Sequence, residues 1–439
     1  MKIAYIAAGA AGMYCGSCIH DNTLAAALIR RGHQVTLVPT YTPLRTDETC
    51  VGVDSVFYGA INVYLEQKSS LYRRLAPQSL DWLLNKPGLL KYVSRFSSAT
   101  SARDLGELTL SILRGEDGYQ RKELYKLIDW LEETARPELV QLTNSMFLGL
   151  AHEIRRRLSI PVICTLQGED IFLDDLPEPY RSQAQELLRQ KASDVDGFVA
   201  PCNSYADFMS EYLNVSREKI HVVPLGIELG GHGVLPRQRT DETTTIGYLA
   251  RICPEKGLHL LVAAFDLLVQ RLGEDRLRLE VAGFLGSRDR AYFDELVEQI
   301  SRSTWQDRFR YWGEVDREQK LEFLSRLDIL SVPTIYRDPK GLFVLEALAN
   351  EVAVVQPGHG SFPELLEKTG GGRLVEPGSV PSLADGLQHL VENSEERMRL
   401  GKQGKKAVNE LFTDEMLAER ALTVYRQYVA PTIGGSRDS

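Results

Sequence analysis

Two carboxylates in the C-terminal half of the chain have the spacing of a ligand-binding site. Asp338 lies eight positions before Glu346, and the turn Pro339–Gly341 and an apolar helical stretch separate them. A buried-strand pattern and a Gly-rich turn follow within Val352–Leu365. Loop, helix, strand and loop in this order would bring both acids and several helix N–H groups to the carboxyl end of a parallel sheet, where α/β proteins bind ligands.

The neighbours of Glu346 leave this acid little polar surface. Leu342, Val344, Leu345, Ala347 and Leu348 surround it in the sequence. An unpaired carboxylate on such a helix would be costly, and two hydrogen bonds from ligand hydroxyls would offset that cost. A solvated helix glutamate is the alternative.

Two cations stand at the end of an earlier predicted strand. Arg251 follows the stretch Thr245–Ala250, and Lys256-Gly257 opens an apolar helix five residues later. Arg supplies a planar fork of donors and Lys a point charge, and together they suit a pyrophosphate. Taken alone, the pair fits two solvated cations at a helix start more simply.

These features together resemble one known family. The acid–seven residues–Glu spacing, the Gly-x-Leu…Lys-Gly stretch over Gly247–Gly257 and the turn Pro357–Leu365 are similar to motifs of the retaining glycosyltransferases of family 4, also called glycosyl transferases group 1. The resemblance covers most of the chain and is strongest over Thr245–Leu411. It implies the GT-B fold, in which two Rossmann-like domains face each other across a cleft, and a nucleotide-sugar donor with neither cofactor nor metal.

The resemblance also implies roles for the residues singled out above. Arg251 and Lys256 would bind the donor diphosphate, and Glu346 the ribose. Asp338 matches the first acid of the motif, which is usually Glu and lies near the sugar ring. The reaction would be the transfer of a hexose to a polysaccharide, lipid-linked or small-molecule acceptor.

Backbone groups would complete the donor site. The N–H groups of Lys340, Gly341, Leu342 and Phe343 would point at sugar hydroxyls or phosphate from the helix N-terminus. The loops at Gly283 and Trp312–Glu314 would surround the base. His359, in the Gly-rich turn, is interpreted as a loop residue rather than a catalyst.

The first half contributes a Gly-rich loop and a strand end. Gly12 and Gly16 follow the first strand and let the backbone approach a phosphate or sugar.

Gln167 occupies a position where many family members have His, near the donor sugar. Gln cannot titrate near neutral pH, so acid–base catalysis there is not expected. Front-face attack guided by the donor phosphate would need no strong protein base. Glu169 and Asp170 are further candidates to contact the acceptor.

Other enzyme classes fit the sequence less well. The first loop reads G-A-A-G rather than G-x-G-x-x-G, and no acid ends the second strand, which argues against a dinucleotide-dependent dehydrogenase. A nucleotide-sugar epimerase, a phosphorylase, or a non-catalytic nucleotide-sugar-binding protein on the same fold stay open. The Asp338 and Gln167 departures are the only support for the last.

Cys15 and Cys18 form a C-x-x-C at a helix start, two residues before His20. Three interpretations stay open: packing beside the glycine loop, a redox-sensitive pair, and a metal site with Cys50. Packing is favoured, because a structural zinc site usually needs four ligands.

The elements that must position these residues form two βα series. Buried strands are expected at Lys2–Ala8, Gln34–Pro39, Glu138–Leu142, Pro161–Leu166, Gly197–Pro201 and Ile220–Pro224, and then at Thr245–Leu249, Arg276–Ala282, Asp328–Val332 and Val352–Gln356. We therefore expect an acceptor domain at 1–228, a donor domain at 241–412 and a C-terminal helix at 413–430 that possibly returns to the first domain. Residues 226–243 have the composition of a hinge or linker.

A helical insertion is expected at about 64–133, where Leu, Tyr and Trp recur at helical spacing among Lys and Arg. Residues 68–122 hold ten Lys or Arg and five Asp or Glu, a net charge of +5 in a chain whose total is −9. A solvated helical face is one interpretation, and contact with an anionic acceptor or membrane headgroups the other. The total charge argues against nucleic acid as a partner. No stretch is long and apolar enough to span a membrane, so a cytoplasmic location is expected.

Overall fold

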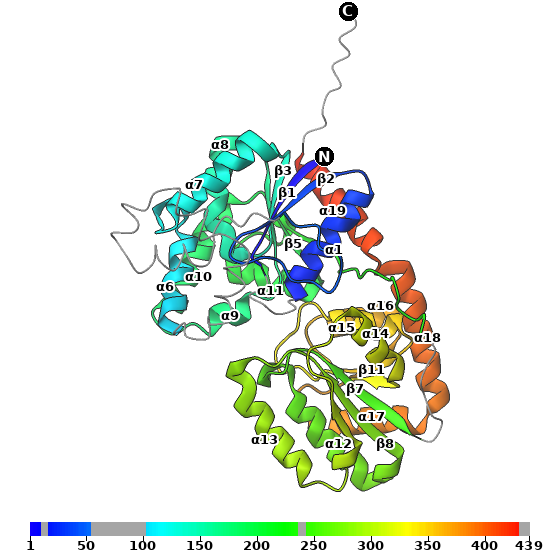
Figure 1. Ribbon diagram of the computed structural model, residues 1–439. Coiled ribbons are helices and arrows are strands. Elements are labelled where there is room, and N and C mark those ends of the chain that lie inside the picture. The colour runs from blue at the N-terminus through cyan, green and yellow to red at the C-terminus, as the bar shows by residue number, and fades with distance from the viewer. Residues whose placement is uncertain (10–15, 54–101, 236–242, 430–439) are drawn as a thin grey trace, which may run out of the picture. The chain divides into compact units, whose positions relative to one another are not determined.

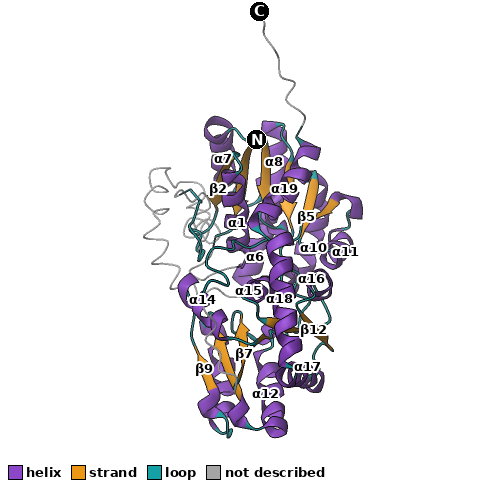
Figure 2. Ribbon diagram, turned by 90° about the vertical axis from the view of Figure 1, so that its right-hand side faces the viewer, coloured by secondary structure: helices purple, strands orange, loops and turns teal. Residues whose placement is uncertain are grey.

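The computed structural model describes residues 1–9, 16–53, 102–235 and 243–429. The chain divides into two compact units, Met1–Pro224 with Glu415–Ser439, and Leu225–Asp414. Each unit contains one six-stranded sheet in which all paired strands are parallel (Figures 1 and 2). The predicted class of two Rossmann-like sheets with helices is confirmed.

The N-terminal unit has the strand order β2-β1-β3-β4-β5-β6. Every strand predicted for this half is present, within one or two residues at each end. The strands are β1 (Lys2–Ala7), β2 (Gln34–Pro39), β3 (Leu139–Leu142), β4 (Val162–Thr165), β5 (Gly197–Ala200) and β6 (Ile220–Val222).

Alternating side chains of this sheet enter two different cores, as the two-residue period of a strand requires. Ala4 and Ile6 of β1 point into one core, while Ile3, Tyr5 and Ala7 point into the other. Both faces are therefore covered, which explains why the strands are apolar almost throughout.

The helices of this unit are α1 (Gly16–Arg30), α6 (Ala102–Leu113), α7 (Arg121–Trp130), α8 (Ala151–Leu158), α9 (Asp170–Asp174), α10 (Tyr180–Lys191), α11 (Asn203–Leu213) and α19 (Asp414–Tyr428). Helix α1 is described from Gly16, next to the helix start expected at Cys15 and Cys18, and its first turns bury polar side chains. The expected insertion is helical over its described part, in α6 and α7. Residues 64–101 of the insertion lie outside the described residues.

The last helix belongs to the N-terminal unit, as the sequence predicted. Leu417, Ala421 and Tyr425 of α19 share a core with β1 and α1. At the end of α1, Arg30 pairs with Glu415 of α19 at 3.2 Å. Figure 1 shows α19, in red, beside the blue α1.

The C-terminal unit has the strand order β12-β11-β10-β7-β8-β9. The strands are β7 (Thr244–Leu249), β8 (Leu277–Ala282), β9 (Phe309–Tyr311), β10 (Ile329–Leu330), β11 (Ala353–Pro357) and β12 (Gly372–Val375). The two edge strands, β9 and β12, were not predicted. Neither contains a fully buried residue, so neither has the apolar run that marks a central strand.

The helices of the C-terminal unit are α12 (Leu258–Leu272), α13 (Arg290–Ser301), α14 (Arg317–Arg326), α15 (Leu342–Ala349), α16 (Phe362–Thr369), α17 (Val380–Glu392) and α18 (Ser394–Leu411). They pack with the sheet into one continuous core. Strand β7 is the first of the unit, and the chain lays β8 and β9 on one side of it and β10, β11 and β12 on the other. The loops after β7 and β10 therefore meet at the switch point of the sheet.

Candidate functional site

The loops that follow β7, β8, β10 and β11 are joined by backbone hydrogen bonds at the carboxyl edge of the second sheet. Ile335 N–H donates to the Glu255 carbonyl at 2.9 Å, and Ser361 N–H donates to the Asp338 carbonyl at 2.8 Å. On the other side of β7, Gly283 N–H donates to the Gly313 carbonyl at 2.8 Å. The residues predicted around the donor thus lie on loops that hold one another in place.

Asp338 is buried and accepts hydrogen bonds on both carboxylate oxygens. Lys256 Nζ lies 2.6 Å from Oδ2, and the Tyr336 hydroxyl donates to the same oxygen at 3.1 Å. The N–H groups of Lys340 and Gly341 donate to Oδ1 at 2.9 and 3.2 Å. The structure thus brings together four of the predicted site residues: Asp338, Lys256, Lys340 and Gly341.

The environment of Asp338 keeps its carboxyl group ionised. Burial alone would raise the pKa, but the Lys256 ammonium and the backbone N–H groups outweigh it and lower the pKa to about 2. Lys256 is also held by rings, with Nζ 5.0 Å from the centroid of Tyr336 and 5.4 Å from that of Phe343. One acid and two aromatic rings therefore define the position of this ammonium.

Helix α15 begins directly after this group. Gly341 precedes it with φ of 63°, and a Cβ there would lie 2.7 Å from the side chain of Leu365. The N–H groups of Lys340 and Gly341 bond to Asp338, and that of Val344 bonds to the Gly341 carbonyl. The N–H groups of Leu342 and Phe343 donate no hydrogen bond to any other described residue. These two groups carry the positive end of the helix dipole.

Glu346 lies one turn into α15 and has a partner that the sequence did not reveal. Lys320 Nζ, on α14, lies 2.6 Å from Glu346 Oε1, and both side chains are largely buried. Lys320 shares the buried face of α14 with Phe323 and Leu324. A lysine three and four residues before two apolar residues of a helix was the signal in the sequence that this cation would be buried and would need an acidic partner. The expectation that an unpaired Glu346 awaits ligand hydroxyls is therefore corrected: one carboxylate oxygen is already paired.

Arg251 follows β7 but does not join the Asp338 group. It is exposed, and its Nε donates to the Cys253 sulfur at 3.4 Å. Across the described residues, no hydrogen bond or ion pair links Arg251 or Glu346 to Lys256 or Asp338. The structure thus places the two cations on one loop and gives them different surroundings.

Gly283 marks a close approach of two loops. A Cβ at Gly283 would lie 1.7 Å from the Ala250 carbonyl oxygen, so no other residue fits there without movement. Its own carbonyl accepts from the Tyr311 hydroxyl at 2.8 Å. The His359 ring is likewise engaged, with Nε2 2.9 Å from the Thr334 carbonyl, in agreement with a loop role.

In the N-terminal unit, Gln167 belongs to a buried polar network. Its Nε2 donates to Asp21 Oδ1 at 2.8 Å and to the Thr143 carbonyl at 2.9 Å. Asp21 also accepts from the Tyr5 hydroxyl at 2.7 Å and the Thr143 hydroxyl at 2.5 Å. Because a carboxylate and a carbonyl can only accept, the amide nitrogen of Gln167 must face them. Sequence reasoning missed Asp21, a buried acid on the first helix.

Glu169 and Asp170 follow Gln167 and have different partners. Glu169 accepts from the N–H groups of Gln167 and Ser145 at 2.6 and 2.8 Å, so it shapes the loop. Asp170 accepts from the Tyr205 hydroxyl at 2.6 Å. Burial raises the pKa of Asp170 to about 6, because no cation lies against it to offset desolvation within the described contacts.

Gly12 and Cys15 lie outside the described residues. Gly16 is the first residue of α1. Cys18 is buried and Cys50 exposed.

Over the described ranges, one group of side chains could hold a metal ion. It is formed by Glu116, His152 and Glu153 and contains no cysteine. Arg156 donates to both carboxylate oxygens of Glu153 at 2.8 and 2.7 Å. The guanidinium of Arg156 therefore already neutralises this acid.

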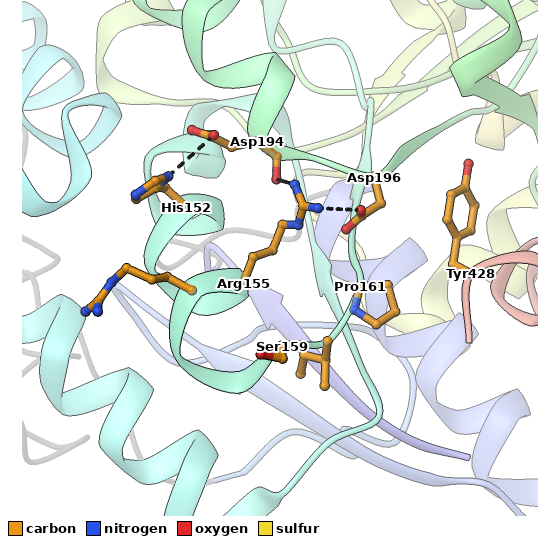
Figure 3. Close-up of a pocket in the computed structure, with 9 residues that line it drawn as sticks. His152, Arg155, Ser159, Pro161, Asp194, Asp196 and Tyr428 are labelled. Carbon is orange, nitrogen blue, oxygen red and sulfur yellow. Dashed lines mark hydrogen bonds and ion pairs between the residues drawn. The ribbon is translucent and has the colours of Figure 1, made fainter. Parts of the chain in front are cut away.

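A pocket of about 690 Å³ lies at the amino ends of β4 and β5. Arg155 bonds the Asp194 carbonyl and pairs with Asp196 at 3.1 Å, and Tyr428 lies on the side away from His152 (Figure 3). Ligands of doubly wound sheets bind at the carboxyl ends of the strands, which is the opposite edge. The pocket therefore does not belong to the predicted site.

Among the described helices, none is both long enough and apolar enough to cross a membrane. The cytoplasmic location and the membrane contact of the basic insertion stay predictions.

Two doubly wound parallel sheets, with a cation–acid group at the switch point of the second, place the chain among the Rossmann-like α/β proteins. Residues 22–226 match the model of the glycosyl transferase 4-like domain, and residues 236–407 match that of glycosyl transferases group 1. The chain belongs to this group of glycosyltransferases, which confirms the predicted family.

Similar proteins include the MMP alpha-(1->4)-mannosyltransferase of Mycolicibacterium hassiacum, 28% identical over 52% of this chain and 53% of that protein. The chain thus spans about half the length of that relative. An uncharacterized glycosyltransferase of Methanocaldococcus jannaschii is 22% identical and covers 94% of both chains.

Solved structures show the same fold. Sucrose-phosphate synthase from Thermosynechococcus elongatus superposes with a TM-score of 0.69 at 18% identity, covering 97% of this chain and 98% of its own. Anabaena HepE in complex with UDP gives 0.67 at 15% identity, covering 97% and 99%. At these identities the likeness extends to the fold alone.

Proposed function

We propose that this protein is a retaining, metal-independent hexosyltransferase that takes its sugar from a nucleotide-sugar donor. The C-terminal unit binds the nucleotide diphosphate, and the N-terminal unit positions the acceptor. Family membership supports the reaction class. The names of relatives, which include a mannosyltransferase and an alpha-monoglucosyldiacylglycerol synthase, support a hexose as the group transferred.

The observation that carries this proposal is the arrangement around Lys256. Its side chain is 18% exposed, and its ammonium lies at the switch point beside the first turn of α15. There the N–H groups of Leu342 and Phe343 are directed out of the helix end. A point charge beside helix N–H groups is a suitable site for a phosphate. A departing nucleoside diphosphate would be stabilised here without a metal.

The remaining predicted contacts belong to the same proposal. Arg251 follows the same strand as Lys256 and would reach the diphosphate from its exposed position. Glu346 would bind ribose hydroxyls through the oxygen that does not face Lys320. Gly283 and the Trp312–Glu314 loop would surround the base, and Gly12, Gly16 and Gln167 would contribute from the first unit.

The test is isothermal titration calorimetry with UDP, GDP and ADP. Lys256→Ala and Glu346→Ala should each weaken the preferred nucleotide at least about tenfold, because a hydrogen bond to a charged group contributes about 1.5–3 kcal/mol. Lys405→Ala is the matched control, since Lys405 also pairs with a glutamate, Glu351, in the C-terminal unit. Unchanged affinity in both site variants, or no binding by the wild type, would refute the proposal.

A binding protein or an epimerase on the same fold would pass that test. Incubation with the preferred nucleotide sugar distinguishes them. A transferase releases nucleoside diphosphate by slow hydrolysis even without its acceptor, whereas an epimerase yields an isomeric sugar and a binding protein yields neither.

A further inference from the structure

We propose that Asp338 is a positioning residue, which acts by holding Lys256 and the turn before α15 and does not itself touch the sugar. This inference rests on the proposed donor site. It departs from the role that the family motif implies for the first acid.

The carboxylate of Asp338 has no unused hydrogen-bonding capacity in the structure. An ionised carboxylate offers about four lone-pair sites, two on each oxygen. Oδ2 accepts from Lys256 Nζ and the Tyr336 hydroxyl, and Oδ1 accepts from the N–H groups of Lys340 and Gly341. The side chain is 4% exposed. A sugar hydroxyl could bond to Asp338 only by displacing one of these four donors.

The length of the side chain suits this role. Aspartate bonds the backbone N–H two residues ahead, which is the hydrogen bond of an Asx turn. Asp338 bonds the N–H groups two and three residues ahead, and so shapes the turn that leads into α15. A glutamate, one methylene longer, would carry its carboxylate past these groups.

The backbone of Asp338 is fixed from the opposite side. Ser361 N–H donates to the Asp338 carbonyl at 2.8 Å. Gly360, with φ of 61°, packs so close that a Cβ would lie 2.5 Å from that same carbonyl oxygen. The loop after β11 thus fixes the backbone of Asp338, while its four donors hold the carboxylate.

Lys256 is the residue through which Asp338 would act. The Lys256 ammonium has three N–H donors, and Asp338 orients one of them. The rings of Tyr336 and Phe343 lie about it. Removing the acid would leave the ammonium unpaired in a largely buried position, where it would turn toward solvent and away from the phosphate.

Calorimetry with the nucleoside diphosphate and with the corresponding nucleotide sugar tests this role. Asp338→Asn should weaken both ligands by the same factor, about tenfold or more, so that the ratio of the two affinities is unchanged. A sugar contact predicts the opposite: weaker binding of the nucleotide sugar only, with unchanged diphosphate affinity, and that result would overturn the inference.

A double-mutant cycle with Lys256→Met adds a second criterion. If Asp338 acts through Lys256, Asp338→Asn should weaken the diphosphate by less than about threefold once Lys256 is Met. Full additivity of the two losses would overturn the inference. Tyr336→Phe is the matched control, because it removes one donor to Oδ2 and leaves the ion pair; it should change affinity less than about threefold.

Asp338→Glu covers the case in which the Asn variant does not fold. The longer acid should also weaken both ligands equally, whereas tighter binding of the nucleotide sugar alone would overturn the inference. Failure of the wild type to bind any nucleotide would reject the proposed function, and is thereby distinguishable from selective loss of the sugar, which rejects only the role of Asp338.

Discussion

Two aspartates, the buried Asp338 and the half-buried Asp170, each at the carboxyl edge of its own sheet, show how a partner decides the charge of a carboxyl group. Asp338 has an ammonium 2.6 Å away and a pKa of about 2. Asp170 has a tyrosine hydroxyl at 2.6 Å and a pKa of about 6. Desolvation acts on both, and only the cation beside Asp338 reverses its effect. The two residues should therefore respond to pH with opposite signs.

For Asp170 the folded-state pKa is raised above the unfolded value of 3.8. The folded state therefore binds the proton more tightly, and stability should fall as the pH rises from about 4 to about 6. Between pH 4 and 7 the wild type should lose about 2 kcal/mol more than Asp170→Asn. Urea unfolding at both pH values measures this. Equal losses in the two proteins would contradict the prediction.

For Asp338 the folded-state pKa is lowered from 3.8. Its contribution is present above pH 4 and should be lost as the pH falls toward 2. The wild type should lose about 2 kcal/mol more than Asp338→Asn between pH 4 and 2. Acid titration followed by circular dichroism would show this as a shallower acid transition in the variant. An identical acid transition would count against the ion pair.

At the scale of elements, the position of Lys256 depends on the glycine that begins α12. Gly257 has φ of 74°, and a Cβ there would lie 1.9 Å from the Pro333 carbonyl oxygen, in the loop after β10. Gly273, at the other end of the same helix, has φ of 87° and nothing within 4 Å. At the C-terminal cap, Gly273 is required by its backbone conformation alone. At the N-terminal cap, Gly257 is required both by its conformation and by the close approach of the Pro333 carbonyl.

Gly257→Ala should destabilise the protein more than Gly273→Ala. A side chain at Gly257, in the left-handed region, costs about 1–2 kcal/mol, and one at Gly273, whose φ of 87° and ψ of 149° lie in a region that glycine alone adopts readily, costs about 1–3 kcal/mol. The contact with Pro333 adds about 1–3 kcal/mol at Gly257 only, because the two loops must separate. Urea unfolding of both variants gives the difference. Equal destabilisation would mean that these loops separate at no cost.

The same scale shows where sequence patterns work and where they fail. The central strands were predicted to within a few residues, because burial on both faces leaves a continuous apolar run. The edge strands β9 and β12 lack that run and were missed. The first turns of α1 do not show an amphipathic pattern because Asp21, Asn22 and Thr23 are buried, which no helical period of apolar residues would indicate.

At the scale of the whole molecule, the chain leaves the N-terminal unit at Pro224 and returns at Glu415. The returning helix α19 completes the core on one face of the first sheet. Tyr425 is fully buried there, and its hydroxyl donates to Gln141 on β3. The N-terminal unit therefore needs residues from both ends of the sequence.

Tyr425→Ala should destabilise the N-terminal unit by about 3–5 kcal/mol, the usual cost of truncating a large buried ring. Hydrogen exchange should accelerate at the amides of β1 and β3, while those of β7 and β8 stay protected, because the substitution lies in the first unit. Tyr425→Phe, which removes only the hydroxyl, should have a smaller effect in the same amides. Uniform acceleration across both sheets would show that the units unfold together.

The sequence by itself determined the fold class, the two βα series, the presence of the last helix and the set of residues near strand ends. These follow from local periodicity and from spacing, which a linear pattern contains. Only the tertiary structure decided the partners: Asp338 with Lys256, 82 positions apart, Asp21 with Gln167, 146 positions apart, and Glu346 with Lys320. The physical reason is that such pairs depend on strand order and on which side chains remain to satisfy a buried charge, and both are properties of the folded chain.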